Sequence, residues 1–406
     1  MKSKYFYGYN IVAAGFVIQA LCVGMSVTYA IFFKEFQDTF GWSRATISGA
    51  LSLSNLIMGA ASILAGRLND KIGPRAIFVT SGFLLGFGYL AMAFIQAPWQ
   101  LFLLYGVLIG AGLSAVDVVV LSMIARWFVK RRGMLSGVIK MGTGVGQLVL
   151  PLTVTILIAA MGWRNAFIII GITFLIILPV VALVLKRDPQ GIGLLPDNGK
   201  DPDFSTASFT DQGLTLKIAI RDKQLWLINA AWFALAFCTL TIILHVVPHA
   251  RDLGLSKTAA AGVLSTIGAV SMLGRPFMGI INDKIGGKRS LVIATTIMLC
   301  SLIWLQVSSE PWMLFVFASI YGFAHGSLYT LLSLIIAECF GTRSHGVLFG
   351  IVWFSGNVGG AIGPVMTGRI FDLTGSYQTA FLILIGMTAF GLFLITLLKP
   401  LQVPGR

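Results

Sequence analysis

The sequence predicts an all-α membrane protein with twelve transmembrane helices, arranged as two pseudo-symmetric bundles of six. Three observations predict this class: apolar segments of membrane-spanning length, a low charge content, and a repeat that relates the two halves. Of the 406 residues, 57% are hydrophobic and only 11% are charged, whereas about 25% are charged in an average soluble domain. A helix of about 20 apolar residues is long enough to cross about 30 Å of hydrocarbon.

Twelve such segments follow one another along the chain. A stretch at 186–222, where charged residues, Pro and Ser concentrate, separates the sixth from the seventh. It predicts a linker between an N-terminal bundle at 1–185 and a C-terminal bundle at 223–406. The predicted spans are 8–33, 44–68, 75–96, 99–125, 133–160, 164–185, 223–249, 256–281, 288–307, 311–338, 345–370 and 376–398.

The net charge of +14 is distributed as in a membrane protein. If the chain changes sides at each span, most of the 29 Lys and Arg residues fall on the side that holds both termini. This is the positive-inside bias, and it predicts both termini in the cytoplasm. We therefore expect a multi-pass protein of the cell (inner) membrane, with the lipid bilayer rather than nucleic acid as its partner.

The two halves repeat at a near-constant offset of 213 residues. Gly66 and Asp70 correspond to Gly279 and Asp283, and other Gly and Pro positions correspond at the same offset. Parallel repeats of six helices, with a substrate site near the midplane between them, are a construction used by transporters. The repeat therefore predicts that the chain carries a small solute across the bilayer.

The segment GRLNDKIGPR at 66–75 resembles the signature loop between the second and third helices of the major facilitator superfamily, and it recurs in part from Gly279 to Arg289. Glycine allows helices to approach closely, while the carboxylate and cations can clasp neighbouring loops. We therefore expect this motif to support gating rather than to contact substrate. The residues concerned are Gly66, Asp70, Arg75, Gly279 and Asp283.

Four further segments resemble the monocarboxylate transporter branch and its bacterial relatives, the oxalate:formate antiporters. They are YGY at 7–9, RWFVKRRG at 126–133, DPQGIGLLPD at 188–197 and VPHARDLG at 247–254. The resemblance covers essentially the whole chain. It implies the transporter fold, a small carboxylate substrate and, at Gly274-Arg275-Pro276, the arginine with which the branch binds substrate.

Arg275 can also be placed without the resemblance. It precedes Asp283 by eight residues, so it lies about 12 Å below the membrane surface at 1.5 Å per residue. A guanidinium at that depth costs roughly 2.5–3.5 kcal/mol, so it must face a polar partner or a wet cavity. Its planar fork suits a carboxylate. The alternative is a structural arginine that holds helix-end carbonyls.

Asp117 and Lys140 are expected at similar depth on consecutive antiparallel spans. Two interpretations remain open. They form a buried ion pair, in which each charge offsets the burial of the other. Alternatively, Asp117 is a proton-coupling carboxylate and Lys140 is available to substrate.

Other polar residues inside spans are weaker candidates. His325 and His245 can shuttle protons or serve as hydrogen-bonded packing residues. Side chains that could donate hydrogen bonds to a carboxylate are Tyr29, Tyr329, Ser355 and Asn357.

The sequence also departs from the relatives. Animal lactate carriers keep a lysine in the first helix and an aspartate one turn before the arginine, where this chain has Val27 and Ser271, so their coupling scheme does not transfer. The span at 345–370 has no lysine, whereas the oxalate antiporter has one there as a second cation, and this argues against a dianion.

We therefore predict a secondary active transporter of a small monocarboxylate of lactate, pyruvate or formate type. It is expected to be a proton-coupled symporter that works by alternating access as a monomer. The alternative is an organic anion antiporter of the oxalate:formate type. No motif indicates a metal, a cofactor or an enzyme site.

Overall fold

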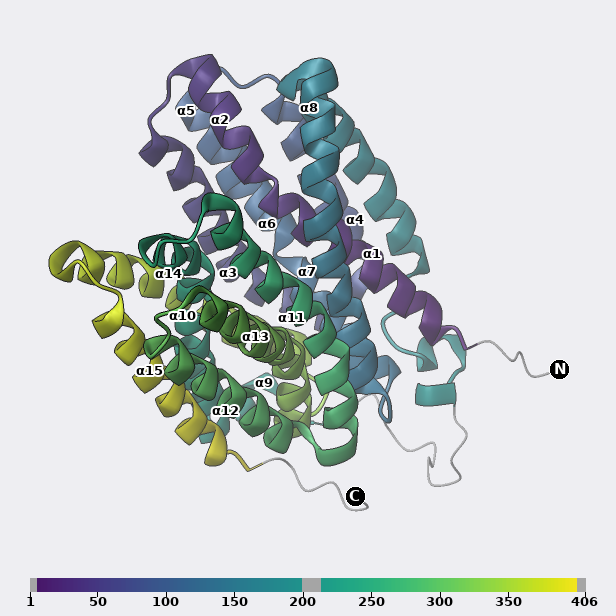
Figure 1. The fold of residues 1–406 in the computed structure, drawn as a ribbon. Coiled ribbons are helices and arrows are strands. Elements are labelled where there is room, and N and C mark those ends of the chain that lie inside the picture. Colours follow the sequence, from purple (N-terminus) through teal and green to yellow (C-terminus); the bar gives the residue numbers. More distant parts are fainter. Residues whose placement is uncertain (1–5, 199–212, 400–406) are drawn as a thin grey trace. The chain divides into compact units, whose positions relative to one another are not determined.

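The structure is a computed structural model that describes residues 6–198 and 213–399 (Figure 1). The two chain ends, which we expect in the cytoplasm, lie outside these ranges. The middle of the predicted linker does so too. Within them the chain is built from helices, apart from one isolated bridge between Gly213 and Gly341. This confirms the all-α fold class.

The long helices follow the apolar segments of the sequence. Before the predicted linker they are α1 (Gly8–Val27), α2 (Tyr29–Phe40), α3 (Arg44–Ile72), α4 (Pro74–Met92), α5 (Pro98–Leu101), the π-helix η1 (Phe102–Ile109), α6 (Gly110–Leu113), α7 (Ala115–Trp127) and α8 (Arg132–Val184). Short 3-10 turns η2 (Gln190–Ile192) and η3 (Pro196–Asn198) follow. The four-residue helix α9 (Leu216–Ala219) also lies within the predicted linker. After the linker come α10 (Lys223–Asp252), α11 (Lys257–Ile285), α12 (Gly287–Gln306), α13 (Pro311–Phe340), α14 (His345–Thr374) and α15 (Gln378–Thr396).

Eleven helical stretches in the described ranges are long and apolar enough to span a membrane. One of them, α8, has 53 residues and contains Gly162 at φ 80°, a conformation that glycine adopts without strain. Gly162 divides α8 into spans at 132–161 and 163–184. The predicted number of twelve spans is thereby confirmed.

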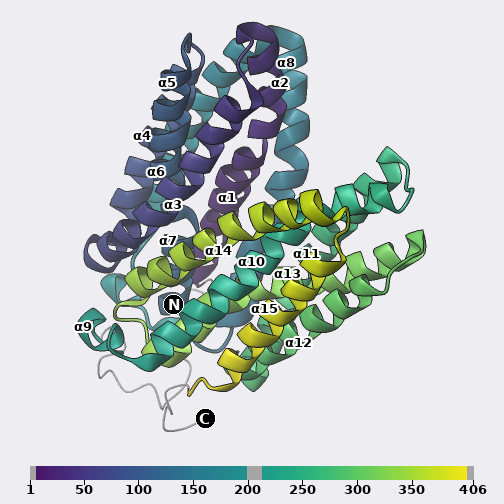
Figure 2. The ribbon, with the colours of Figure 1, turned by 90° about the vertical axis from the view of Figure 1, so that its left-hand side faces the viewer.

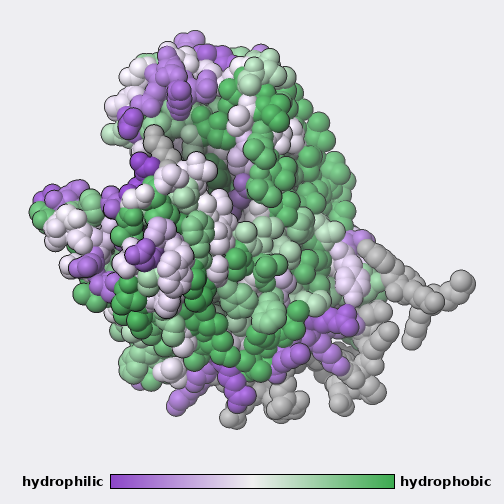
Figure 3. All heavy atoms as spheres, in the orientation of Figure 1, coloured by the Kyte–Doolittle hydropathy of each residue, from purple (hydrophilic) through white to green (hydrophobic). Residues whose placement is uncertain are grey.

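Large apolar side chains are exposed along the flanks of many helices, among them Leu148, Leu152 and Ile156 of α8. Figure 3 shows hydrophobic residues over these flanks and hydrophilic residues gathered toward helix ends. A soluble protein rarely exposes so large a contiguous apolar surface. The pattern is that of a multi-pass protein whose helix flanks face lipid.

Internal contacts group the chain into two compact units. Among the described residues, unit 1 comprises 6–130, 141–198 and 342–350, and unit 2 comprises 131–140, 213–341 and 351–399. In unit 1, α3 packs against η1, α6 and α7. In unit 2, α11 packs along α13, and α12 contacts both α13 and α15 (Figure 2). The predicted bundle boundaries stay a prediction, because the two units are defined by internal contacts and not by the two halves of the sequence repeat.

Candidate functional site

Arg275 of α11 is buried, with 5% of its surface exposed. Its guanidinium Nη1 donates to the backbone oxygen of Lys140 in the first turns of α8. Gly137, one turn before Lys140, allows this approach, because an added Cβ would overlap the backbone of Arg275. Unit 2 therefore brings together two basic residues that are far apart in the sequence.

The ammonium group of Lys140 lies against aromatic rings. Its Nζ is 5.8 Å from the ring centre of Trp353 and 6.0 Å from that of Tyr329. Trp232 packs edge-on against Tyr329, with ring centres 5.4 Å apart. A cation over an aromatic face is attracted by the ring quadrupole, and more strongly where water is excluded. The rings thus stabilise the charge of a residue that is only 3% exposed.

His325 lies on the same face of α13 as Tyr329, one turn earlier. Its ring centre is 5.1 Å from that of Tyr329 and 5.8 Å from that of Tyr321, and it interacts electrostatically with Arg275 and Lys140. We call the group of six residues the cation–aromatic cluster; its members are Lys140, Trp232, Arg275, His325, Tyr329 and Trp353.

The other predicted hydrogen-bond donors engage backbone oxygens. Ser355 donates to the carbonyls of Val352 (2.8 Å) and Asn229 (3.2 Å), and the Asn357 amide donates to Trp353 O at 3.1 Å. Tyr29 belongs to unit 1, where its hydroxyl donates to Ile47 O at 2.7 Å. Their roles toward substrate stay predictions.

Asp117 lies in unit 1 within a chain of side-chain hydrogen bonds. The Nε2 of buried Gln19 donates to Asp117 Oδ1 at 2.8 Å, and Thr143 Oγ1 donates to Gln19 Oε1, also at 2.8 Å. The amide of Gln19 therefore orients the carboxylate between α1, α7 and α8. Both interpretations of Asp117 and Lys140 remain predictions.

The motif carboxylates cap helix starts in the same way in both repeats. Asp70 accepts from the backbone N–H groups of Gly346 (3.2 Å) and Val347 (3.0 Å). Asp283 accepts from those of Gly133 (2.6 Å) and Met134 (2.9 Å). A carboxylate at a helix N-terminus satisfies unpaired N–H groups and complements the helix dipole.

The residues of the signature motif also make contacts that are not shared by both copies or that do not involve the carboxylates. Asp70 also forms an ion pair with Arg126 at 2.5 Å. Glycines bring the capped helices close, because a Cβ at Gly66 would overlap Gly346 O and one at Gly279 would overlap Gly133 O. Arg75 is exposed at the start of α4.

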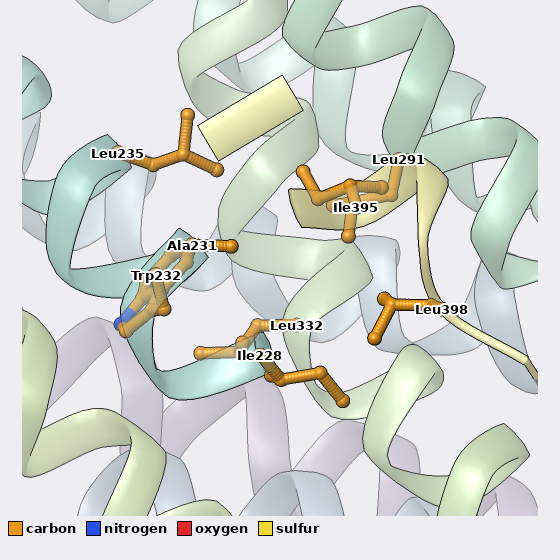
Figure 4. Close-up of a pocket in the computed structure, with 8 residues that line it drawn as sticks. All are labelled: Ile228, Ala231, Trp232, Leu235, Leu291, Leu332, Ile395 and Leu398. Atoms are coloured by element: carbon orange, nitrogen blue, oxygen red, sulfur yellow. The ribbon is translucent and has the colours of Figure 1, made fainter. Parts of the chain in front are cut away.

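A small cavity also occurs in unit 2 among α10, α12, α13 and α15 (Figure 4). Apart from Trp232, its lining is aliphatic, with Ile228, Leu291 and Ile395 among the residues that face it. A carboxylate would lose its hydration there without gaining a hydrogen-bond partner. The cation–aromatic cluster is therefore the better candidate for a charged solute.

Sequence reasoning missed several residues of these clusters. Trp353 and Trp232 lie in apolar helices, where an aromatic residue does not stand out in the sequence. Only their positions in the structure show that they belong to the cation–aromatic cluster. Gln19 and Thr143 could have been found as polar residues inside spans, which are costly unless they are hydrogen-bonded.

The family model of the Major Facilitator Superfamily matches residues 15–275 and 234–406. The chain belongs to the major facilitator superfamily. Monocarboxylate transporter 13 of Rattus norvegicus is 27% identical over 380 residues, which cover 93% of this chain and 85% of that protein. The oxalate:formate antiporter of Oxalobacter formigenes is 27% identical over 361 residues, covering 85% of this chain and 82% of the antiporter.

A solved structure supports the fold of this superfamily member. The fucose:proton symporter of E. coli aligns with a TM-score of 0.71 at 15% identity, over 95% of this chain and 97% of the symporter. The chain is thus a multi-pass membrane transporter, and its relatives are transporters rather than enzymes, as the sequence predicts.

Proposed function

We propose that this chain is a secondary active transporter of a small monocarboxylate of lactate, pyruvate or formate type. We place it in the cell (inner) membrane as a monomer with both termini cytoplasmic. The observation that carries the proposal is the hydrogen bond from Arg275 to the backbone of Lys140, whose ammonium lies against two aromatic rings in unit 2. Relatives named as monocarboxylate transporters support the same substrate class.

Arg275 is the residue to which we assign the substrate carboxylate. A guanidinium presents paired N–H donors in a rigid plane, and this geometry matches the two oxygens of a carboxylate. Arg275 and Lys140 are both buried, and a charge-assisted hydrogen bond is stronger where little water reaches it. Tyr329, Ser355 and Asn357 of the same unit are the proposed additional donors.

Proton coupling is assigned to Asp117 first, with His325 as the second candidate. Moving a lone anion inward against 100 mV costs about 2.3 kcal/mol, so a co-transported proton makes uptake electroneutral. Asp117 is a carboxylate on a spanning helix, held by the Gln19 amide. Carboxylates inside spanning helices serve as proton relays in pumps and transporters.

Substitution of Arg275 tests the substrate assignment. Arg275→Lys keeps the charge but loses the bidentate geometry, and we expect it to abolish carboxylate uptake into proteoliposomes, as Arg275→Ala should, while the protein still inserts and folds. The matched control is Arg221→Lys, at an exposed arginine just before α10 and outside the signature motif, which should transport as the wild type does. Uptake by Arg275→Lys at wild-type affinity would remove Arg275 from the site.

A second candidate function is exchange of organic anions, as in the oxalate:formate antiporter to which the chain is similar. The observation that favours it is the position of Lys140, whose charge lies in the same cluster as that of Arg275. Two cations can neutralise two carboxylates. Competition between mono- and dicarboxylates separates the two functions.

The signature motif is proposed to support gating. Asp70 and Asp283 hold helix starts through backbone N–H groups, and Gly66 and Gly279 allow close approach there. Such contacts can form and break as a transporter changes state.

A further inference from the structure

The unexplained feature of the cation–aromatic cluster is the imidazole of His325. Its Nδ1 is buried and has no hydrogen-bond partner among the described residues. Its ring neighbours, Tyr321 and Tyr329, pack against it by their faces and edges. A buried polar atom costs free energy until something bonds to it.

The position of His325 relative to Arg275 is fixed by close packing of α11 and α13. Gly274, next to Arg275, leaves room only for the Phe323 carbonyl, and Gly326, next to His325, leaves room only for the Ser271 carbonyl. Neither glycine can accept a side chain without displacing the opposite backbone. The backbone positions of Arg275 and His325 are therefore held in a constant register.

The two tyrosines beside His325 do not play equivalent roles. The hydroxyl of Tyr321 donates to Thr239 O of α10 at 3.2 Å, and this hydrogen bond anchors the Tyr321 ring to α10. Tyr329 instead faces the ammonium of Lys140. The imidazole thus lies between Tyr321, which is anchored to α10, and Tyr329, whose ring faces the Lys140 ammonium.

We propose that His325, in its neutral form, is a specificity-determining residue that recognises an oxygen on the carbon next to the substrate carboxylate. A neutral imidazole has one donor and one acceptor nitrogen. It can therefore donate to the oxygen of a 2-oxo acid or accept from the hydroxyl of a 2-hydroxy acid. It also adds no third positive charge beside Arg275 and Lys140. This inference rests on the proposed function, because Arg275 must hold the carboxylate.

Competition for labelled pyruvate uptake in proteoliposomes at pH 7 tests this role. Propionate is the informative competitor, because it has the carbon chain of pyruvate and lactate but lacks the 2-oxygen. A site built to hydrogen-bond an oxygen discriminates strongly against an analogue without it. We expect pyruvate and lactate to compete at least about tenfold more strongly than propionate.

Substitution then assigns the preference to His325. In His325→Phe, pyruvate and lactate should compete only about as strongly as propionate, while propionate competes as before. His325→Asn keeps a donor and an acceptor, so it should still prefer pyruvate and lactate over propionate by about threefold or more. The control His249→Phe changes a histidine of α10 that packs on Phe381, outside the cluster, and should keep the full ratio.

The failures of the two proposals are distinguishable. A wild type that transports carboxylates without preferring the 2-oxygen, or a His325→Phe protein that keeps the preference, overturns the role of His325 and leaves the proposed function intact. Loss of gradient-driven accumulation in His325→Phe with the preference unchanged likewise overturns it, and makes His325 the proton carrier. A wild type that binds none of these carboxylates overturns both proposals.

Discussion

At the residue scale, the polar groups inside the spans are held by specific partners. The Asp117 carboxylate accepts from Gln19, whose own oxygen accepts from Thr143. An isolated charge inside a bilayer is costly, and partners of this kind reduce that cost. The hydrogen bond from Gln19 fixes the orientation of the carboxylate to which we assign proton coupling.

Neutralising Asp117 separates coupling from transport. If Asp117 carries the proton, Asp117→Asn should lose accumulation driven by an imposed pH gradient but keep exchange of preloaded substrate, because exchange requires no net proton movement. Both activities can be measured in the same proteoliposomes. If the double variant Asp117→Asn with Lys140→Met accumulates substrate normally under a pH gradient, the two residues are structural and His325 becomes the next group to test.

Residues differed in how well the sequence predicted their surroundings. Arg275 is identified both by the resemblance and by its depth, because a charge inside an apolar helix is conspicuous, and in the structure it donates to the backbone of Lys140. The contact of Lys140 with Trp353 could not be predicted, since it depends on how α8 and α14 approach each other. The hydrogen bond from the Tyr29 hydroxyl to Ile47 O could not be predicted either, because it depends on how α2 and α3 pack.

At the element scale, glycines set how closely helices pack. In α11, Gly279 lies against the backbone of Gly133 in α8, whereas an added Cβ at Gly268 of the same helix would meet nothing within 4 Å. Small residues at such contacts provide the van der Waals packing that associates helices in lipid.

These two glycines of α11 form a matched pair for mutation. Gly279→Ala should destabilise the protein by about 1–3 kcal/mol, because the new methyl group displaces the opposing backbone. Gly268→Ala should be neutral or stabilising by up to about 1 kcal/mol, since alanine favours the helix. Thermal unfolding of the detergent-solubilised variants measures the difference. Equal melting temperatures for the two variants would show that the α8–α11 contact is looser than the structure indicates.

Elements were predicted well where hydrophobicity decides them and less well where local geometry does. The boundary within α8 was expected between 160 and 164, and Gly162 lies there at positive φ. The π-helix Phe102–Ile109 was not predicted, because its residues are as apolar as those of an α-helix. The break at Thr28 between α1 and α2 likewise has no hydrophobic signal.

At the scale of the whole molecule, the repeat explains why similar chemistry appears twice while the candidate site appears once. The carboxylate caps at Asp70 and Asp283 are related by the 213-residue offset. Arg275 has no such counterpart, because Ser62 stands at the corresponding position. This difference between the two halves agrees with the proposal that Arg275 binds the substrate.

The charge of the preferred substrate distinguishes the two candidate functions. Arg275 presents the fork that suits one carboxylate, whereas the Lys140 ammonium lies over the rings of Trp353 and Tyr329. A dianion would have to draw Lys140 away from these rings, at a cost of about 0.5–2 kcal/mol, or keep one carboxylate poorly compensated in a dry site. Each 1.4 kcal/mol is a tenfold change in affinity. We therefore expect lactate and pyruvate to compete for binding, and oxalate to compete at least about tenfold more weakly, at both pH 6 and pH 8. Tighter binding of oxalate at both pH values would assign Lys140 to the substrate and make anion exchange the function, and Lys140→Met should then lose oxalate binding while lactate still binds.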